Sequence, residues 1–332
     1  VDLRSSALLR SEIVDRSSTW RPFDRLILLA AWARFSGEAA TRWAALAAPK
    51  PYRAIALELA MAAWARSQPE AARAAFERDH AGDTAAMVGL VAGWLESDPK
   101  GLRAFIEGLD LSLDTGQHGV AVYFRRLIER DGTAAAEAWA EGRSAVWNPR
   151  RTRHLYRQVA SELTMADPAA GVAFCERHCE GESGGAVRQM VATRWSMRDP
   201  TATMAWLLAA DDADPDERRY AVNAGYGNWI RAAPSAALDW ALDQDPALRE
   251  ASWFEPVVRR VARALEWNQA EEALIWAESI ARAGARERTQ VFVLKRWRAR
   301  DEAGAEAWIS SSTLSEAARR EIRSETHVRP GA

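Results

Sequence analysis

The residues whose types could bind a metal lie close together in one short segment, CERHC. Cys175, His178 and Cys179 fall at positions i, i+3 and i+4 of an expected helix, so their side chains share one face. Two thiolates and an imidazole could supply three ligands to a soft metal such as zinc, with His154 the nearest candidate fourth ligand in the sequence. The favoured interpretation is two small buried thiols and a surface histidine, with no metal or other cofactor. Cysteines on successive turns of one helix rarely suit a mutual disulfide, so we expect none.

The sequence contains no recognisable catalytic or nucleotide-binding motif. The remaining histidines, His80, His118 and His327, have no serine or cysteine at a catalytic spacing. The GxSxG, HExxH and P-loop patterns are missing from the sequence. Gly225-Tyr226-Gly227 follows no expected strand, so we interpret its glycines as points of close helix approach. We therefore predict no catalytic residues and no enzymatic activity within this sequence.

The chain does contain a repeated pair of anchors, most of them large and apolar, that lie eleven positions apart. The first members of successive pairs are separated by 30 to 36 residues. A period near this value is typical of stacked helical hairpins. The pairs are Trp32/Trp43, the degraded copy Trp64/Ala75, Trp94/Phe105, Ile128/Trp139, Leu163/Phe174, Trp195/Trp206, Trp229/Trp240, Leu265/Trp276 and Trp297/Trp308.

Prolines and small residues indicate how each repeat is built. Proline follows the first anchor by five positions in five repeats, and aspartate precedes that proline at Asp98, Asp167 and Asp199. Aspartate then proline suits the N-cap and first position of a helix, so the first anchor should end one helix and the proline should open the next. Three residues past the proline position lies a small residue in most repeats, which would let two helix axes approach closely. These positions are Ala40, Ala72, Ala136, Gly171, Thr203, Ala237, Ala273 and Ala305, with Leu102 as the exception.

These features predict an all-α fold, an α-solenoid of about nine helical hairpins wound into a right-handed superhelix and forming one domain over residues 1–332. The N-terminal cap should cover residues 1–19, the hairpins 20–311, and the C-terminal cap and tail 312–332. The first hairpin should comprise helices at 22–35 and 38–47, and the last helix of the final hairpin should lie at 302–310. Most of the 16 tryptophans should lie in a continuous core. The connection 111–119 (LSLDTGQHG) is polar and long, and such loops can carry specificity.

Composition argues against some classes of partner. The net charge of −2 with 27% charged residues leaves no excess of base, so we expect no nucleic-acid partner. Only three of the 44 basic residues are lysine, a bias that we attribute to genome composition rather than phosphate recognition. No apolar run is long enough to span a bilayer. The chain begins at Val1 rather than Met, which favours an extracytoplasmic bacterial location but leaves the compartment open.

The pattern resembles tetratricopeptide-like repeats, in its period, its two helices per unit and the small residue early in the second helix. Three departures are plain. The step from small residue to aromatic is three positions rather than four, the family's Leu-Gly pair is missing, and proline opens the second helix. The resemblance covers nearly the whole chain at the level of architecture, and it implies a scaffold that binds proteins or peptides. It places the family's small position on Ala72, Ala136, Ala237, Ala273 and Ala305, and its later aromatic near Trp139, Trp206, Trp240, Trp276 and Trp308.

The resemblance also implies where a partner binds, because the first helix of each hairpin lines the inner face of such solenoids. Residues two, five and six before the first anchor should then point inward. In the later repeats these positions form a polar strip with a basic bias, which suits an acidic segment: Tyr123, Arg126, Arg157, Gln158, Gln189, Asn223, Arg259, Arg260, Arg263 and Lys295. In the first three repeats they are mostly apolar: Leu26, Ile27, Ala30, Glu58, Leu59, Ala62, Val88, Gly89 and Ala92. The apolar set would hold an apolar segment, unless tight curvature buries it within the protein.

The sequence therefore predicts a non-catalytic scaffold for protein–protein interaction, which could serve as a subunit of a larger complex. One alternative is a superhelical accessory region of a cell-wall or other enzyme whose catalytic domain lies elsewhere. A second is a metal- or haem-carrying helical protein that uses the CERHC segment.

Overall fold

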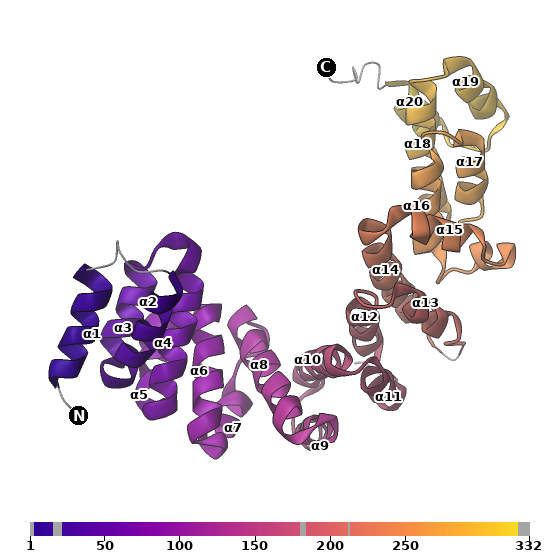
Figure 1. Cartoon of the computed structure of the whole chain (residues 1–332). Coiled ribbons are helices and arrows are strands. Elements are labelled where there is room, and N and C mark those ends of the chain that lie inside the picture. Colours follow the sequence, from indigo (N-terminus) through magenta and orange to yellow (C-terminus); the bar gives the residue numbers. More distant parts are fainter. Residues whose placement is uncertain (1–2, 16–21, 180–183, 212, 325–332) are drawn as a thin grey trace. The chain divides into compact units, whose positions relative to one another are not determined.

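The computed structural model describes residues 3–15, 22–179, 184–211 and 213–324. Within these ranges the chain is helical and contains no strand, as the sequence predicts (Figure 1). The chain divides into two compact units, Val1–Phe174 and Cys175–Ala332. The single domain expected over residues 1–332 stays a prediction, and the C-terminal tail from residue 325 lies outside the described ranges.

The first unit is a succession of paired helices, joined through a short 3₁₀ turn at Lys50–Tyr52 and a π-helical turn at Phe76–His80. Its helices are α1 (Leu3–Asp15), α2 (Pro22–Phe35), α3 (Gly37–Leu46), α4 (Arg53–Ser67), α5 (Pro69–Ala75), α6 (Thr84–Ser97), α7 (Pro99–Gly108), α8 (Asp114–Asp131), α9 (Thr133–Ser144) and α10 (Pro149–Ala166). The expected helices at 22–35 and 38–47 correspond to α2 and α3 within one residue at each end. The expected loop at 111–119 is wrong in its second half, because α8 begins at Asp114.

Helix α11 (Pro168–His178) spans the division between the units, and the second unit continues the same alternation with a 3₁₀ turn at Pro246–Glu250. Its helices are α12 (Gly184–Trp195), α13 (Pro200–Leu208), α14 (Pro215–Ala232), α15 (Pro234–Leu242), α16 (Glu255–Leu265), α17 (Ala270–Glu278), α18 (Ala283–Arg298), α19 (Glu302–Ser311) and α20 (Glu316–Ser324). The expected helix at 302–310 corresponds to α19.

The predicted helix starts are confirmed at the prolines. Helices α5, α7, α11, α13 and α15 begin at the five prolines that follow a first anchor by five positions: Pro69, Pro99, Pro168, Pro200 and Pro234. The carboxylates of Asp98 and Asp199 accept hydrogen bonds from the backbone N–H groups of Gly101 and Ala202, at 3.0 and 2.9 Å. Each bond satisfies one of the donors that the first helical turn leaves without an intrahelical partner.

The small residue of each repeat lies where helices meet. Ala40, Ala136 and Ala237 are fully buried, and so is Leu102, the exception to the small-residue rule. At Gly171 a Cβ atom would lie 2.1 Å from the Thr164 hydroxyl oxygen, so a side chain would push α10 and α11 apart. These positions are therefore buried whether the residue is small or large, and at Gly171 the contact leaves no space for a side chain.

The aromatic anchors form much of the core. Trp94, Trp229 and Trp276 are buried, and every anchor of the predicted pairs is at least partly buried. Ring contacts join three predicted pairs, with centroids 5.4 Å apart in Trp94/Phe105, 6.1 Å in Trp195/Trp206 and 5.4 Å in Trp229/Trp240. Of the tryptophans in the described ranges only Trp267, which is not an anchor, is mainly exposed, at 64%.

Within each unit the first helices of the pairs pack against one another in sequence order (Figure 1). In the first unit α2, α4, α6, α8 and α10 form such a row, and in the second unit α12, α14, α16 and α18 do. The closest approach joins α4 and α6, where Cβ atoms at Gly89 and Gly93 would lie 2.2 and 2.1 Å from the carbonyl oxygens of Glu58 and Ala62. Glycine at these two positions lets the helix backbones touch.

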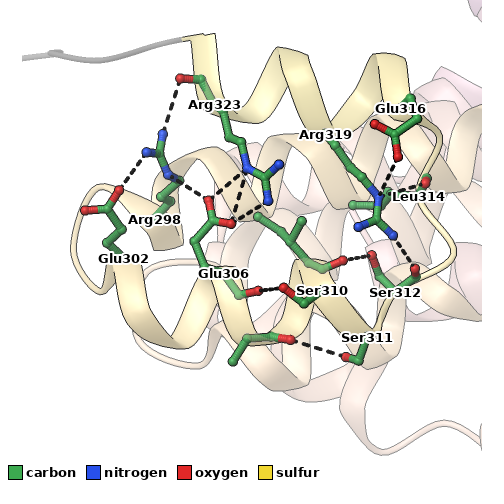
Figure 2. Close-up of polar contacts among 12 residues, drawn as sticks. Arg298, Glu302, Glu306, Ser310, Ser311, Ser312, Leu314, Glu316, Arg319 and Arg323 are labelled. Carbon is green, nitrogen blue, oxygen red and sulfur yellow. Dashed lines mark hydrogen bonds and ion pairs between the residues drawn. The ribbon is translucent and has the colours of Figure 1, made fainter.

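The second unit ends in a helix held by arginine contacts (Figure 2). Arg323 of α20 binds the Glu306 carboxylate of α19 at 2.6 Å, and Arg298 of α18 binds the same carboxylate at 3.3 Å. Arg319 donates to the Ser312 carbonyl oxygen at 2.7 Å. These contacts fasten α20 as the closing helix that the sequence predicts near this end. In the described part of the chain, no helix combines the length and apolarity that crossing a bilayer requires.

Candidate partner-binding site

The predicted polar strip lies on the first helices of the pairs, four residues in the first unit and six in the second. Tyr123 and Arg126 lie on α8, Arg157 and Gln158 on α10, Gln189 on α12, Asn223 on α14, Arg259, Arg260 and Arg263 on α16, and Lys295 on α18.

In the first unit most of these residues bond within the protein. Tyr123 is only 3% exposed and packs on Trp139 with ring centroids 5.6 Å apart, so its side chain is not available to a partner. Arg126 pairs with Glu129 at 2.9 Å. The Gln158 amide donates to the Gln117 side-chain oxygen at 3.4 Å. Among the charged strip residues of this unit, only Arg157 has no ion pair within the described ranges.

The apolar positions of the first unit are mostly half-buried. Ile27 is 67% exposed, but Gly89 is buried against the α4 backbone. Leu26, Leu59 and Val88 are each partly covered. Burial within the protein thus accounts for much of this surface, and an apolar partner segment stays a prediction.

In the second unit the sequence of α16 separates an apolar face from a basic one. Val257, Val258 and Val261 are fully buried in the core of this unit. Arg259 and Arg263 lie one helical turn apart and outside this apolar face. Arg259 is half-buried and Arg263 is exposed. Helical periodicity therefore places the guanidinium groups beside the core rather than in it.

Arg260 lies against α14. Its guanidinium donates to the carbonyl oxygens of Pro256 and Asn223, at 3.1 and 3.4 Å. A Cβ atom at Gly227 would lie 2.8 Å from the Arg260 Nη2 atom, so glycine there makes room for the side chain. Burial lowers the pKa of Arg260, and the charge on Arg259 adds to this effect. Beside it the Tyr226 hydroxyl donates to the Ala237 carbonyl oxygen at 3.1 Å.

Arg259 and Arg263 form the more accessible part of the basic face. Burial lowers the pKa of Arg259, and the arginines at 263, 282 and 288 lower it further, although Glu255 opposes them. The Arg263 guanidinium stacks over the Phe292 ring of α18, 4.7 Å from the ring centroid. Arg288 was not among the predicted residues, because the positions two, five and six before each anchor lie in the last two turns of the first helix and Arg288 lies earlier on α18.

The arginines of the basic face differ from their neighbours in having no carboxylate partner. Arg282 pairs with Glu255 at 2.5 Å, and Lys295 pairs with Glu321 at 3.0 Å. Across residues 3–15, 22–179, 184–211 and 213–324, no acidic side chain forms an ion pair with Arg259, Arg260 or Arg263. We call these three residues the α16 basic face. The nearby Glu255 carboxylate is paired with Arg282, so the face keeps a positive charge that suits a further carboxylate.

Two further predicted residues flank this face along the chain. Gln189 of α12 is exposed. The Asn223 side-chain oxygen is buried and has no hydrogen-bond partner within the described ranges, which leaves an acceptor unmet beside Arg260.

The expectation for the CERHC segment is wrong in one respect. The structure joins Cys175 and Cys179 in a disulfide, with Cα atoms 4.8 Å apart. Helix α11 ends at His178, and the Cys179 backbone N–H still bonds the Cys175 carbonyl oxygen in the α-helical i-to-i+4 pattern, at 2.6 Å. The separation of the Cα atoms lies within the range that a disulfide can bridge. A disulfide has no thiolate, so in this state the segment offers no sulfur ligand to a metal. Over the described residues no group of three or more His, Cys, Asp or Glu side chains has a metal-binding arrangement.

Comparisons with known proteins give no relative: no protein-family model, curated protein or solved structure matches this chain.

Proposed function

We propose that the chain is a non-catalytic helical-repeat scaffold, an α-solenoid of about nine hairpins. Its second unit would hold an acidic segment of a protein partner against the α16 basic face. The observation that carries this proposal is the absence, among the described residues, of any ion pair to Arg259, Arg260 and Arg263. The rows of first helices also favour it, because helices that pack only on their neighbours leave one long side of each unit for docking.

The physical argument rests on charge. Three guanidinium groups within two helical turns repel one another, and burial of Arg259 and Arg260 weakens the solvation that would offset this repulsion. A carboxylate that arrives from a partner forms charge-assisted hydrogen bonds, which are roughly twice as strong as neutral ones. Arg259 and Arg263 stand one turn apart, so acidic residues four apart on a helical segment would match them.

A binding experiment with charge reversal tests the proposal. A fluorescently labelled glutamate-rich helical peptide should bind the full chain, and the Arg259→Glu/Arg263→Glu variant should bind it at least tenfold more weakly, about 1.4 kcal/mol. Arg260 stays unchanged because it bonds the α14 backbone. Fluorescence anisotropy measures the affinity, which should also fall as salt screens the charges.

The matched control reverses two other exposed arginines, Arg103→Glu/Arg198→Glu, and so changes the net charge by the same amount. Circular dichroism checks that both variants keep their helical content. Equal weakening in both variants would show a general charge effect, and no binding by the unmodified chain would refute the docking of acidic segments.

A further inference from the structure

A second polar site lies in the first unit and shares no residue with the α16 basic face. A cavity of about 430 Å³ opens between the end of α7, the following loop and the first turns of α10. Arg150, Arg151 and His154 of α10 line one part of it, and Asp110 and Ser112 of the loop line another. A volume of this size lies within the range of small-molecule sites, about 300–1,000 Å³.

The first turn of α10 carries the opposite charge from the one that a helix start favours. The macrodipole places positive partial charge at a helix N-terminus, where acidic residues stabilise and basic ones destabilise. Helix α14 follows this rule, with Asp216 and Glu217 in its first turn. Helix α10, which has the same length of 18 residues and also begins with proline, has no acidic residue in its first turn and carries Arg150 and Arg151 there.

Arg151 is held rigidly as part of the cavity wall. Its Nη2 atom donates to the carbonyl oxygens of Glu107 and Leu109, the latter at 3.0 Å. The guanidinium also stacks over the Trp147 ring at 4.0 Å from the centroid. Its Nε atom is buried and lacks a hydrogen-bond partner in the part of the chain that the structure describes. The buried Nε atom cannot itself reach a ligand, but the fixed guanidinium places a cation in the cavity wall, and a fixed cation is preorganised for an anion.

One carboxylate of the cavity, Asp110, lies near Arg150 and Arg151 but forms no ion pair with either within the described ranges. The Asp110 carboxylate accepts hydrogen bonds from the Ser112 N–H at 2.8 Å and the Ser112 hydroxyl at 2.7 Å. These bonds, then the charges of Arg150 and Arg151, hold the pKa of Asp110 below its usual range. Glu107 pairs with Arg143 at 3.0 Å. Arg150 is exposed and has no ion pair within the described ranges.

His154 adds a neutral polar group to the cavity. Burial lowers its pKa, and the nearby arginines at 157, 150 and 153 lower it further, against Asp110, which raises it. The lowered pKa favours the uncharged imidazole, whose ring nitrogens offer one hydrogen-bond donor and one acceptor.

We propose that this cavity binds the phosphate group of a small phosphate monoester, with Arg150 and Arg151 on the phosphate oxygens. A phosphate dianion neutralises two guanidinium groups more fully than a single carboxylate does. The planar guanidinium can also form two parallel hydrogen bonds to phosphate oxygens. The volume leaves room for an organic group beside the phosphate. The proposal does not depend on the proposed scaffold function.

Calorimetric titration with glycerol 3-phosphate tests the site, with inorganic phosphate as a second probe and chloride used to keep the ionic strength constant. The full chain should bind glycerol 3-phosphate at millimolar concentration or below. The Arg150→Gln variant should bind it about tenfold more weakly, since a charge-assisted hydrogen bond is lost. The Arg150→Lys variant, which keeps the charge but loses the fork, should lie between the two. Tighter binding of the monoester than of inorganic phosphate would identify the organic ester as the source, and the reverse would identify the free ion.

Two controls separate this site from general charge effects. Arg103→Gln changes another exposed arginine of the same unit and should leave phosphate affinity unchanged, as should Arg259→Glu/Arg263→Glu in the second unit. The proposal fails if phosphate does not bind, if Arg103→Gln weakens binding as much as Arg150→Gln does, or if succinate binds as tightly as glycerol 3-phosphate.

Discussion

Two groups of arginines in the second unit carry similar charge but differ in their partners. Arg298, Arg319 and Arg323 around α20 are bonded to carboxylates and carbonyl oxygens of neighbouring helices (Figure 2). Arg259 and Arg263 on α16 have no carboxylate partner among the described residues. The first group fastens α20 to its neighbours, whereas the second adds no ion pair to the fold within the described ranges. Arginine frequency alone does not distinguish the two, and the surroundings of each guanidinium do.

The largest expected effect comes from breaking an ion pair of a buried carboxylate beside the basic face. Glu255 is 3% exposed and its carboxylate is held by Arg282 at 2.5 and 2.7 Å, whereas the Arg282 side chain is half exposed. Arg282→Ala would leave the carboxylate without its partner, but water can reach this side of the pair, so the free energy of unfolding should fall by about 2 kcal/mol. Urea unfolding followed by circular dichroism measures the loss, and amide hydrogen exchange should place it at α16.

Arg282→Lys is the control, since it keeps a charge near Glu255 and should lose less stability. If Arg282→Ala hardly changes the free energy of unfolding, Arg259 has replaced Arg282 as the partner of Glu255. The double variant Arg259→Ala/Arg282→Ala should then show the full loss of stability.

A smaller, pH-dependent effect is expected in the paired group. The Arg323 side chain, and to a lesser degree the charge of Arg298, holds the pKa of Glu306 below its usual range. Its contribution to stability is therefore complete above about pH 4.3, the ordinary glutamate value, and is lost as the pH falls through the lowered pKa of the folded protein. Glu306→Gln should reduce stability at pH 7 and make little difference in strong acid. Urea unfolding of both proteins at pH 7 and in strong acid measures the difference, with the exposed Glu278→Gln as the control. An equal effect of Glu306→Gln at the two pH values would contradict the prediction.

The smallest expected effect is on the basic face itself. Arg259→Ala removes a half-buried charge that has no ion pair in the described ranges, so stability should change by no more than about 0.5 kcal/mol. The same variant should weaken binding of the acidic peptide. A stability loss as large as that of Arg282→Ala would mean that Arg259 serves the fold, and the contrast between the two groups would disappear.

Much of the helical plan could be predicted from the sequence. Asp98 and Asp199 each precede a proline, and both cap the helices predicted to start there. The anchor arithmetic also placed Arg259, Arg260 and Arg263 on one helix. Caps, helical periodicity and apolar spacing act over a few residues, so the linear order of the chain carries them.

The tertiary structure decided what each side chain meets. The anchor arithmetic placed Tyr123 on an accessible face, yet it is buried against Trp139 from the following helix. The structure joins Cys175 and Cys179, one helical turn apart, in a disulfide that their spacing did not predict. The cavity at Arg150 combines α10 with a loop that ends about forty residues earlier in the chain. Contacts of this kind depend on how helices distant in the sequence pack, and local spacing does not encode that geometry.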